Sequence, residues 1–267
     1  CAGFADFVQM SGCKGKIHII NSRFEGAQDD PINVHGTHLK VIAYEPGNKI
    51  VVRFMHPQSY GFEAFFPGDE VEFTEIHSLQ CLHKASVLKV ERINDYDCKL
   101  TLNSSVPSIL PQQEVVIENI TWTPEVEIRN NYFARTPTRG ILVTTRRKVI
   151  IENNVFYRTP MSAIAVSNDA LSWYESGPVH DLTIRNNHFI ECGSPVINIA
   201  PENNRPNGTV HKGIRIENNR FTLKDKQAIY ARWTDNIRIS GNYFDGIYPI
   251  STKESVLLEH CTNVENE

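Results

Sequence analysis

One eight-residue unit recurs six times in this chain of 267 residues and constrains its fold more than any other feature. The unit reads apolar-x-apolar-x-Asn-Asn-x-Phe, with minor departures, and its copies end at Phe24, Phe133, Phe156, Phe189, Phe221 and Phe244. Its alternating apolar positions predict a short strand with one inward face. Asn tolerates left-handed backbone angles and bonds to nearby main chain, so the Asn pair turns the chain without glycine. We expect the Phe to pack into the interior of the next wall.

A second strand follows the unit at a fixed offset. An isoleucine stands eight residues after five of the six Phe, at Ile32, Ile141, Ile164, Ile197 and Ile229. Two or three short strands per 23 residues, with no helical period between them, indicate an all-β fold, a parallel β-helix. Identical residues of successive turns would then form ladders about 4.8 Å apart. An antiparallel sandwich is the alternative, but it gives no reason to repeat Asn-Asn-x-Phe in register.

The uneven spacing of the units locates insertions. Successive Phe lie 109, 23, 33, 32 and 23 residues apart, so the first step exceeds one 23-residue turn by 86. This surplus, residues 38–123, contains short apolar runs separated by turn signals such as EPGN and FPGD. It predicts a small antiparallel β-barrel or sandwich inserted into a β-helix of residues 1–37 and 124–267. Smaller insertions fall in 167–180 and 201–212, and the common offset of all three predicts that they wall a groove on one edge of the coil.

A group of aspartates carries the predicted chemistry. Asp29 and Asp30 directly precede the second strand, and Asp6 lies 23 residues before Asp29, which is about one turn. Stacking should bring the three carboxylates together and split their pKa values, so that one acts as an acid while others stay ionised. Inverting glycoside hydrolysis needs such a set. A calcium site and ordinary solvated turn aspartates are the alternatives, although calcium prefers more oxygen ligands than these.

Four further residues are candidates for binding a substrate. Arg139 aligns with Asp30 once the insertion is removed, so it could pair with a carboxylate, hold a sugar hydroxyl or form a surface salt bridge. Trp173 and Glu175 lie in the WYES segment at the groove edge, where Trp could stack on a sugar or pack under its own loop. His35 follows the Asp pair on the same strand and could face the groove or bond to a core neighbour.

Composition excludes several classes of function. The formal net charge of −4 argues against nucleic acid as a partner. No apolar run approaches the roughly 18 residues needed to span a bilayer. The six cysteines show no metal-ligand spacing, so we expect free thiols, no metal site and no cofactor. Arg146 and Arg147 precede a repeat strand and are expected in a solvated turn. The chain starts without Met, in what reads as the middle of an element, so we expect a fragment.

The motifs resemble those of two glycoside hydrolase families. An Asp, an Asp-Asp pair one turn later and a following His-Gly are similar to the polygalacturonases of family 28, although the Arg-x-Lys motif of that family is not visible. The strings QDDPINVHGTHL, RGILVTTRR and ALSWYESGPVHDLTIRNNHF resemble glycoside hydrolase family 110 more closely. That family comprises inverting exo-α-1,3-galactosidases on a right-handed parallel β-helix with inserted barrel modules. Its members are about twice this length, so the resemblance implies that N-terminal turns and their cap are missing.

The resemblance also assigns roles that the residues alone leave open. It makes Asp29 the general acid and Asp6 with Asp30 the base that holds the attacking water. It implies a glycan partner with terminal α-galactose and a secreted, periplasmic or cell-surface location in a bacterium. A homo-oligomer would cover the bare ends of the coil. A non-catalytic carbohydrate-binding β-helix and a polygalacturonase-like hydrolase of acidic polysaccharide are the competing interpretations.

Overall fold

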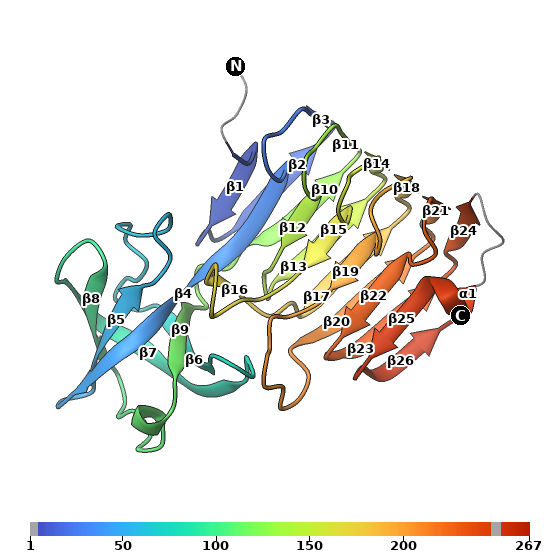
Figure 1. The fold of residues 1–267 in the computed structure, drawn as a ribbon. Coiled ribbons are helices and arrows are strands. Elements are labelled where there is room, and N and C mark those ends of the chain that lie inside the picture. Colours follow the sequence, from blue (N-terminus) through green and yellow to red (C-terminus); the bar gives the residue numbers. More distant parts are fainter. Residues whose placement is uncertain (1–4, 247–251) are drawn as a thin grey trace.

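The computed structural model describes residues 5–246 and 252–267 and consists of a coil of short parallel strands with a separate group of antiparallel strands at one end (Figure 1). Within these residues, one wall of the coil is a seven-stranded parallel sheet of β2 (Lys16–Ile20), β10 (Glu125–Arg129), β13 (Lys148–Glu152), β17 (Asp181–Arg185), β20 (His211–Glu217), β23 (Thr234–Ser240) and β26 (Thr262–Asn266). A second wall has six strands, β3 (Arg23–Glu25), β11 (Tyr132–Ala134), β14 (Val155–Tyr157), β18 (His188–Ile190), β21 (Arg220–Leu223) and β24 (Tyr243–Gly246).

The third wall carries the second strand of each predicted unit. It consists of β1 (Val8–Ser11), β4 (Ile32–Glu45), β12 (Ile141–Val143), β15 (Ile164–Val166), β19 (Ile197–Ile199), β22 (Ile229–Arg232) and β25 (Val256–Glu259). The five isoleucines that follow the repeat are paired in register along this wall. A short helix, α1 (Thr252–Ser255), precedes β25. The predicted parallel β-helix is therefore confirmed, and the sandwich alternative is wrong for the coil.

The repeat phenylalanines stack inside the coil. Their rings form one continuous column in which neighbouring centroids lie 4.7 to 5.1 Å apart. This spacing equals the separation of adjacent strands, because each ring occupies the same register position in its own turn. Four of the rings have no exposed surface, so they contribute to the core of the coil together with the isoleucine ladder.

The two asparagines of the repeat unit have different structural roles. The first has a left-handed backbone, with φ between 52° and 56° at Asn21, Asn130, Asn153, Asn186 and Asn218. The second forms a buried ladder along the coil. The side-chain oxygen of Asn154, for example, accepts the backbone N–H of Asn131 at 2.9 Å, and its amide nitrogen donates to the carbonyl oxygen of Ile128. Asn187, Asn219 and Asn242 continue the pattern.

The inserted residues form a closed antiparallel barrel. Its strands are β4, β5 (Lys49–Phe54), β8 (Asp97–Leu102), β7 (Cys81–Arg92), β6 (Glu70–Glu75) and β9 (Val115–Asn119), and β9 pairs back to β4. A 3-10 turn, η1 (Leu110–Gln112), leads into β9. The barrel has a hydrophobic core of its own, so the barrel form of the sequence expectation is the observed one. β4 runs without a break from the coil into the barrel and so belongs to both (Figure 1).

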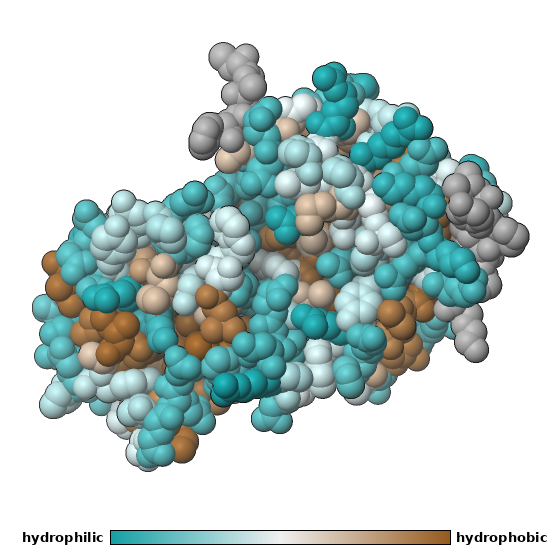
Figure 2. All heavy atoms as spheres, viewed as in Figure 1, coloured by the Kyte–Doolittle hydropathy of each residue, from teal (hydrophilic) through white to brown (hydrophobic). Residues whose placement is uncertain are grey.

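Two expectations from composition concern the chain as a whole. In the part of the chain that the structure describes, no helix has the length and apolar character needed to cross a membrane. Cys13, Cys81, Cys98, Cys192 and Cys261 are free thiols, whereas Cys1 lies outside the described residues. The surface over the coil is mostly hydrophilic, and hydrophobic residues gather on the barrel at the lower left of Figure 2.

Candidate active site

A groove of about 630 Å³ runs along the outer face of the third wall. Its floor is made by outward side chains of β1, β4, β12, β15 and β19, namely Gln9, Asn33, Leu142, Ala165 and Asn198. Residues of all three insertions line it: from the barrel His56, Gln58 and Ser59, from the loop after β15 Ser167, Asp169, Leu171, Ser172, Trp173 and Glu175, and from the loop after β19 Glu202 and Asn204. The predicted walls of the groove are thus observed.

The three aspartates come together at the end of this groove where β1 and β4 begin. The backbone N–H of Asp30 donates to Oδ1 of Asp6 at 3.1 Å, and all three aspartates line the groove. Val8 pairs with Ile32, so the turn at this point contains 24 residues. Asp6 therefore stands at the level of Asp30, one position away from the alignment with Asp29 that the 23-residue spacing predicts.

Asp30 is the most completely bonded of the three. Its side chain is 2% exposed and accepts hydrogen bonds from the hydroxyl of Thr138 at 2.7 Å and from the backbone N–H of Arg139 at 3.2 Å. The Arg139 guanidinium holds both carboxylate oxygens, with Nε at 3.0 and 3.1 Å and a terminal nitrogen at 2.9 Å. A bidentate contact of this kind stabilises the ionised carboxylate. Of the possibilities for Arg139, the structure shows the pairing with a carboxylate.

Asp6 and Asp29 are in different electrostatic situations. Burial raises the pKa of Asp6 to about 6, and the neighbouring carboxylates of Asp30 and Asp29 add to this effect. Asp29 is half-buried, and within the described residues no donor lies within hydrogen-bond distance of its carboxylate. The carboxylate of Asp29 is therefore open to a group in the groove, whereas that of Asp30, which also lines the groove, already accepts bonds from Thr138 and Arg139.

Glu175 connects the aspartates to the opposite edge of the groove. Its Oε1 accepts a hydrogen bond from Nδ2 of Asn33 at 3.1 Å, and the same Asn33 side chain lowers the pKa of Asp6, against the larger effect of burial. Nε2 of His35 lies 3.5 Å from the same Glu175 oxygen, and Nδ1 of His35 contacts the carbonyl oxygen of Gly36 at 2.6 Å. His35 is 2% exposed, because β16 (Glu175–Ser176) pairs antiparallel with β4 and covers it. A molecule in the groove would meet Glu175 before His35.

Trp173 is on the surface of the groove and is 56% exposed. Its ring contacts that of His56 from the barrel, with centroids 4.7 Å apart and planes inclined at 31°. The prediction of an accessible Trp at the groove edge agrees with this placement, whereas a Trp buried under its own loop does not. The contact with His56 also joins the loop after β15 to the barrel across the groove.

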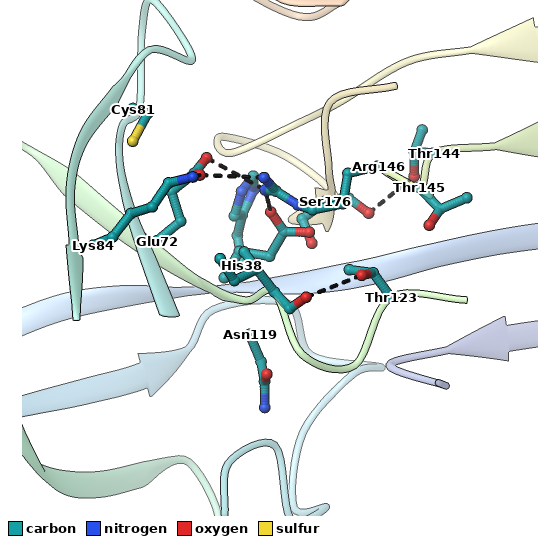
Figure 3. Close-up of polar contacts among 12 residues, drawn as sticks. His38, Glu72, Cys81, Lys84, Asn119, Thr123, Thr144, Thr145, Arg146 and Ser176 are labelled. Carbon is teal, nitrogen blue, oxygen red and sulfur yellow. Dashed lines mark hydrogen bonds and ion pairs between the residues drawn. The ribbon is translucent and has the colours of Figure 1, made fainter. Parts of the chain in front are cut away.

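The expectation for Arg146 is wrong. Its side chain is only 7% exposed and lies between the carboxylates of Glu72 and Glu118, both of which belong to the barrel. Figure 3 shows the contact of Arg146 with Glu72. Nζ of Lys84 bonds to Glu72 at 3.2 Å, so two cations balance two carboxylates at the junction of coil and barrel. Arg147 is exposed and donates to Thr123 and to a carbonyl oxygen, as a turn residue can. The TTRR string by itself does not indicate that Arg146 pairs with Glu118 and Glu72, which lie 28 and 74 residues earlier in the chain.

No group of three or more His, Cys, Asp or Glu side chains suited to a metal ion occurs among residues 5–246 and 252–267. The groove also contains residues that the sequence analysis did not single out. Asn33 could have been found from strand alternation, since it lies between two buried residues of β4. His56 could not, because only the folded barrel brings it to the groove.

Comparisons with known proteins give a consistent picture. Residues 113–267 match the family model described as right handed beta helix region, and residues 49–116 match GLAA-B beta-barrel domain II. An alpha-1,3-galactosidase A of Bacteroides thetaiotaomicron is 52% identical over 98% of this chain and 47% of its own length. The corresponding protein of Akkermansia muciniphila is 43% identical over 91% of this chain and 41% of its own. An alpha-1,3-galactosidase B of Bacteroides fragilis is 35% identical over 98% and 48%.

The chain therefore spans about half the length of the curated relatives that it matches. These identities confirm the resemblance to glycoside hydrolase family 110 that the sequence strings indicated.

Proposed function

Since the chain belongs to the right-handed β-helix family and is homologous to α-1,3-galactosidases over nearly all of its length, we propose that it is the catalytic portion of a glycosidase that removes terminal α-1,3-linked galactose from glycans. The observation that carries the proposal is the grouping of Asp6, Asp29 and Asp30 at one end of a groove whose opposite edge presents Trp173 and Glu175. Carboxylates on one side and a sugar-binding edge on the other are what glycoside hydrolysis requires.

The proposed reaction is a single displacement that inverts the anomeric carbon. The carboxyl group of Asp29, which has no hydrogen-bond donor beside it among the described residues, gives its proton to the glycosidic oxygen as the bond to the leaving sugar breaks. Asp6 and Asp30 hold the water that attacks C1 from the opposite face, and the base takes its proton. Arg139 binds both carboxylate oxygens of Asp30, and the carboxyl of Asp6, whose pKa lies near 6, is a stronger base than an ordinary aspartate yet is ionised at pH 7. Bond breaking and water attack together yield β-galactose.

Trp173 and Glu175 complete the proposed sugar site. The exposed Trp173 ring offers an apolar face for a galactose ring, and Glu175 accepts bonds from sugar hydroxyls while Asn33 orients its carboxylate. His35 lies behind Glu175 and supports it, so its part in binding is indirect. In this scheme Arg139 fixes the Asp30 carboxylate in place and has no direct contact with the sugar.

The charge of the groove favours a neutral substrate. The ionisable residues that line it are mainly acidic, namely Asp6, Asp29, Asp30, Asp169, Glu175 and Glu202, against Arg139 and His56. The Arg139 charge is already engaged by Asp30. An acidic polysaccharide such as polygalacturonate would be repelled from such a surface, whereas a galactoside carries no charge. The groove thus weighs against the polygalacturonase-like alternative.

The test is the hydrolysis of terminal α-1,3-galactosides by the full-length protein, with NMR of the fresh product. Release of β-galactose, with no turnover of polygalacturonate, supports the proposal, and release of α-galactose overturns the single displacement. Binding of the glycan without cleavage would identify the non-catalytic alternative. A glycan substrate of this kind also goes with the proposed secreted, periplasmic or cell-surface location, which fractionation of the source bacterium would check.

A further inference from the structure

The loop that carries Trp173 and Glu175 is wound around a single buried carboxylate. Asp169 is 5% exposed, and its two oxygens accept the backbone N–H groups of four consecutive residues, Leu171, Ser172, Trp173 and Tyr174. The distances, where the contact is of ordinary length, are 2.8 to 3.1 Å. In addition, the N–H of Asp169 donates to the carbonyl oxygen of Glu175 at 2.9 Å, which closes the segment into a ring.

This ring is fastened to the coil where β4 enters the barrel. His38 is 1% exposed, and its backbone N–H donates to the carbonyl oxygen of Tyr174 at 2.8 Å. Nδ1 of the same His38 lies 2.9 Å from the carbonyl oxygen of Asp169. β16 pairs with β4 at Gly36 and Thr37, and the hydroxyl of Thr144 donates to the carbonyl oxygen of Ser176. The loop is thus held at both ends, and the Asp169 carboxylate fixes its interior.

The groove side of the ring bears the two side chains of the sugar-binding edge. Trp173 is 56% exposed although its backbone is bonded inward, and Glu175 reaches Asn33 on the groove floor. Four N–H groups that converge on one carboxylate leave that segment little conformational freedom, since charge-assisted bonds are the stronger ones. The positions of Trp173 and Glu175 therefore depend on Asp169, whose carboxylate oxygens already accept the N–H groups of the loop.

We propose that Asp169 is a positioning residue of the glycan site, which shapes segment 169–175 so that Trp173 and Glu175 are presented to the sugar. The inference rests on the proposed function, since it is the galactoside that these two side chains would hold. Without the carboxylate, four backbone donors lose their shared acceptor, and the loop can move away from the groove. Substrate binding then weakens, while the three aspartates that precede β1 and β4 remain in place.

The test compares Asp169→Ala and Asp169→Asn in the full-length protein with Asp69→Asn as the matched control. Asp69 is also a buried turn carboxylate, 6% exposed, that accepts the N–H of Phe66 and the side chain of Asn119, but it lies in the barrel and does not line the groove. We expect Asp169→Ala to raise KM for an α-1,3-galactosyl disaccharide on the order of 10-fold with a much smaller change in kcat. Asp169→Asn, which keeps an acceptor oxygen, should lie between it and the wild type, and the control should stay within about twofold.

A second measurement follows the loop itself, independently of catalysis. Acrylamide quenching of Trp173 fluorescence, obtained by difference from a Trp173→Phe background, should increase in Asp169→Ala and stay unchanged in Asp69→Asn. A folded Asp169→Ala protein with unaltered KM and quenching overturns the proposal, as does an equal effect of the control. If the wild type hydrolyses no galactoside, the proposed function fails, while the quenching still decides whether Asp169 shapes the loop.

Discussion

At the scale of single residues, the three aspartates at the end of the groove lie in three different environments. Asp30 is buried and held by Arg139, Asp6 is half-buried beside like charges, and Asp29 has no donor to its carboxylate within the described part of the chain. Neighbouring carboxylates cannot all be ionised at low cost, so the environment decides which of them gives and which takes a proton. The proposed roles, Asp29 as acid and Asp6 with Asp30 as base, therefore predict a different effect for the substitution of each aspartate.

Substitution of Asp29 should depend on the leaving group. If Asp29 is the acid, Asp29→Asn lowers kcat/KM for an α-1,3-galactosyl disaccharide by about 10³-fold. The same variant should lose less than about 10-fold on α-galactosyl fluoride, because fluoride leaves without being protonated. Asp6→Asn serves as the comparison, since loss of the base impairs both substrates. An equal loss on the two substrates in Asp29→Asn would refute the acid assignment.

Ionisation of Asp6 should lower the stability of the folded protein at neutral pH. Its pKa of about 6 lies above the ordinary 3.8, so ionisation is less favourable in the folded state. The cost is fully present above pH 6, declines between pH 6 and 4, and is absent below. Asp6→Asn, which retains the acceptor for the Asp30 N–H, should raise stability at pH 7.5 by about 1 kcal/mol, less than the full shift implies because solvent screens a half-buried group. Thermal unfolding at pH 7.5 and pH 3.5 checks this, and a gain that persists at pH 3.5 contradicts it.

At the scale of elements, the repeat explains why so much of the fold could be predicted. Each Asn and Phe acts within its own turn and on the same residue of the next turn, so the spacing in sequence translates directly into stacking. The same periodicity placed Asp30 beside Arg139 across a barrel of intervening chain. It missed the pairing of Arg146 with Glu72 and the arrival of His56 at the groove, because those contacts depend on how the barrel docks and no repeat encodes that.

The asparagine ladder should be sensitive only at its inward position. Asn154 is 1% exposed and bonds to the turns on both sides, so Asn154→Ala leaves buried backbone groups without partners and should cost about 3 kcal/mol. Asn153 is exposed with φ of 56°, and Asn153→Gly should change stability by less than about 1 kcal/mol, since glycine adopts that conformation freely. Urea unfolding of both variants gives the comparison. Equal losses would mean that the ladder bonds contribute nothing specific.

At the scale of the whole molecule, the coil and the barrel must hold a fixed relation, because both line the groove. The boundaries between coil and barrel at residues 38 and 123 stay a prediction. β4 continues across residue 38 as one unbroken strand. Beside that strand, Arg146 from the coil inserts between two barrel carboxylates, one of which, Glu118, lies so close to Gly177 that a Cβ there would collide with it. The ion cluster therefore supports the base of β16, and with it the loop that carries Glu175.

Removal of Arg146 should uncouple the two parts. Arg146→Met leaves Glu72 and Glu118 facing each other in a buried site, which typically costs 3–5 kcal/mol. We expect amide hydrogen exchange to accelerate in β6 and β9 while the Asn ladder of the coil keeps its protection.

Because the site is buried, the stability lost in Arg146→Met should change little between 0.05 and 0.5 M salt. The triple variant with Glu72→Gln and Glu118→Gln should recover much of the stability, since neither buried side chain then carries a charge and the Lys84 side chain is 59% exposed to solvent. Arg147→Ala is the matched control and should leave β6 and β9 protected; uniform acceleration throughout coil and barrel in Arg146→Met would show instead that the cluster stabilises the fold as a whole and has no particular role in docking.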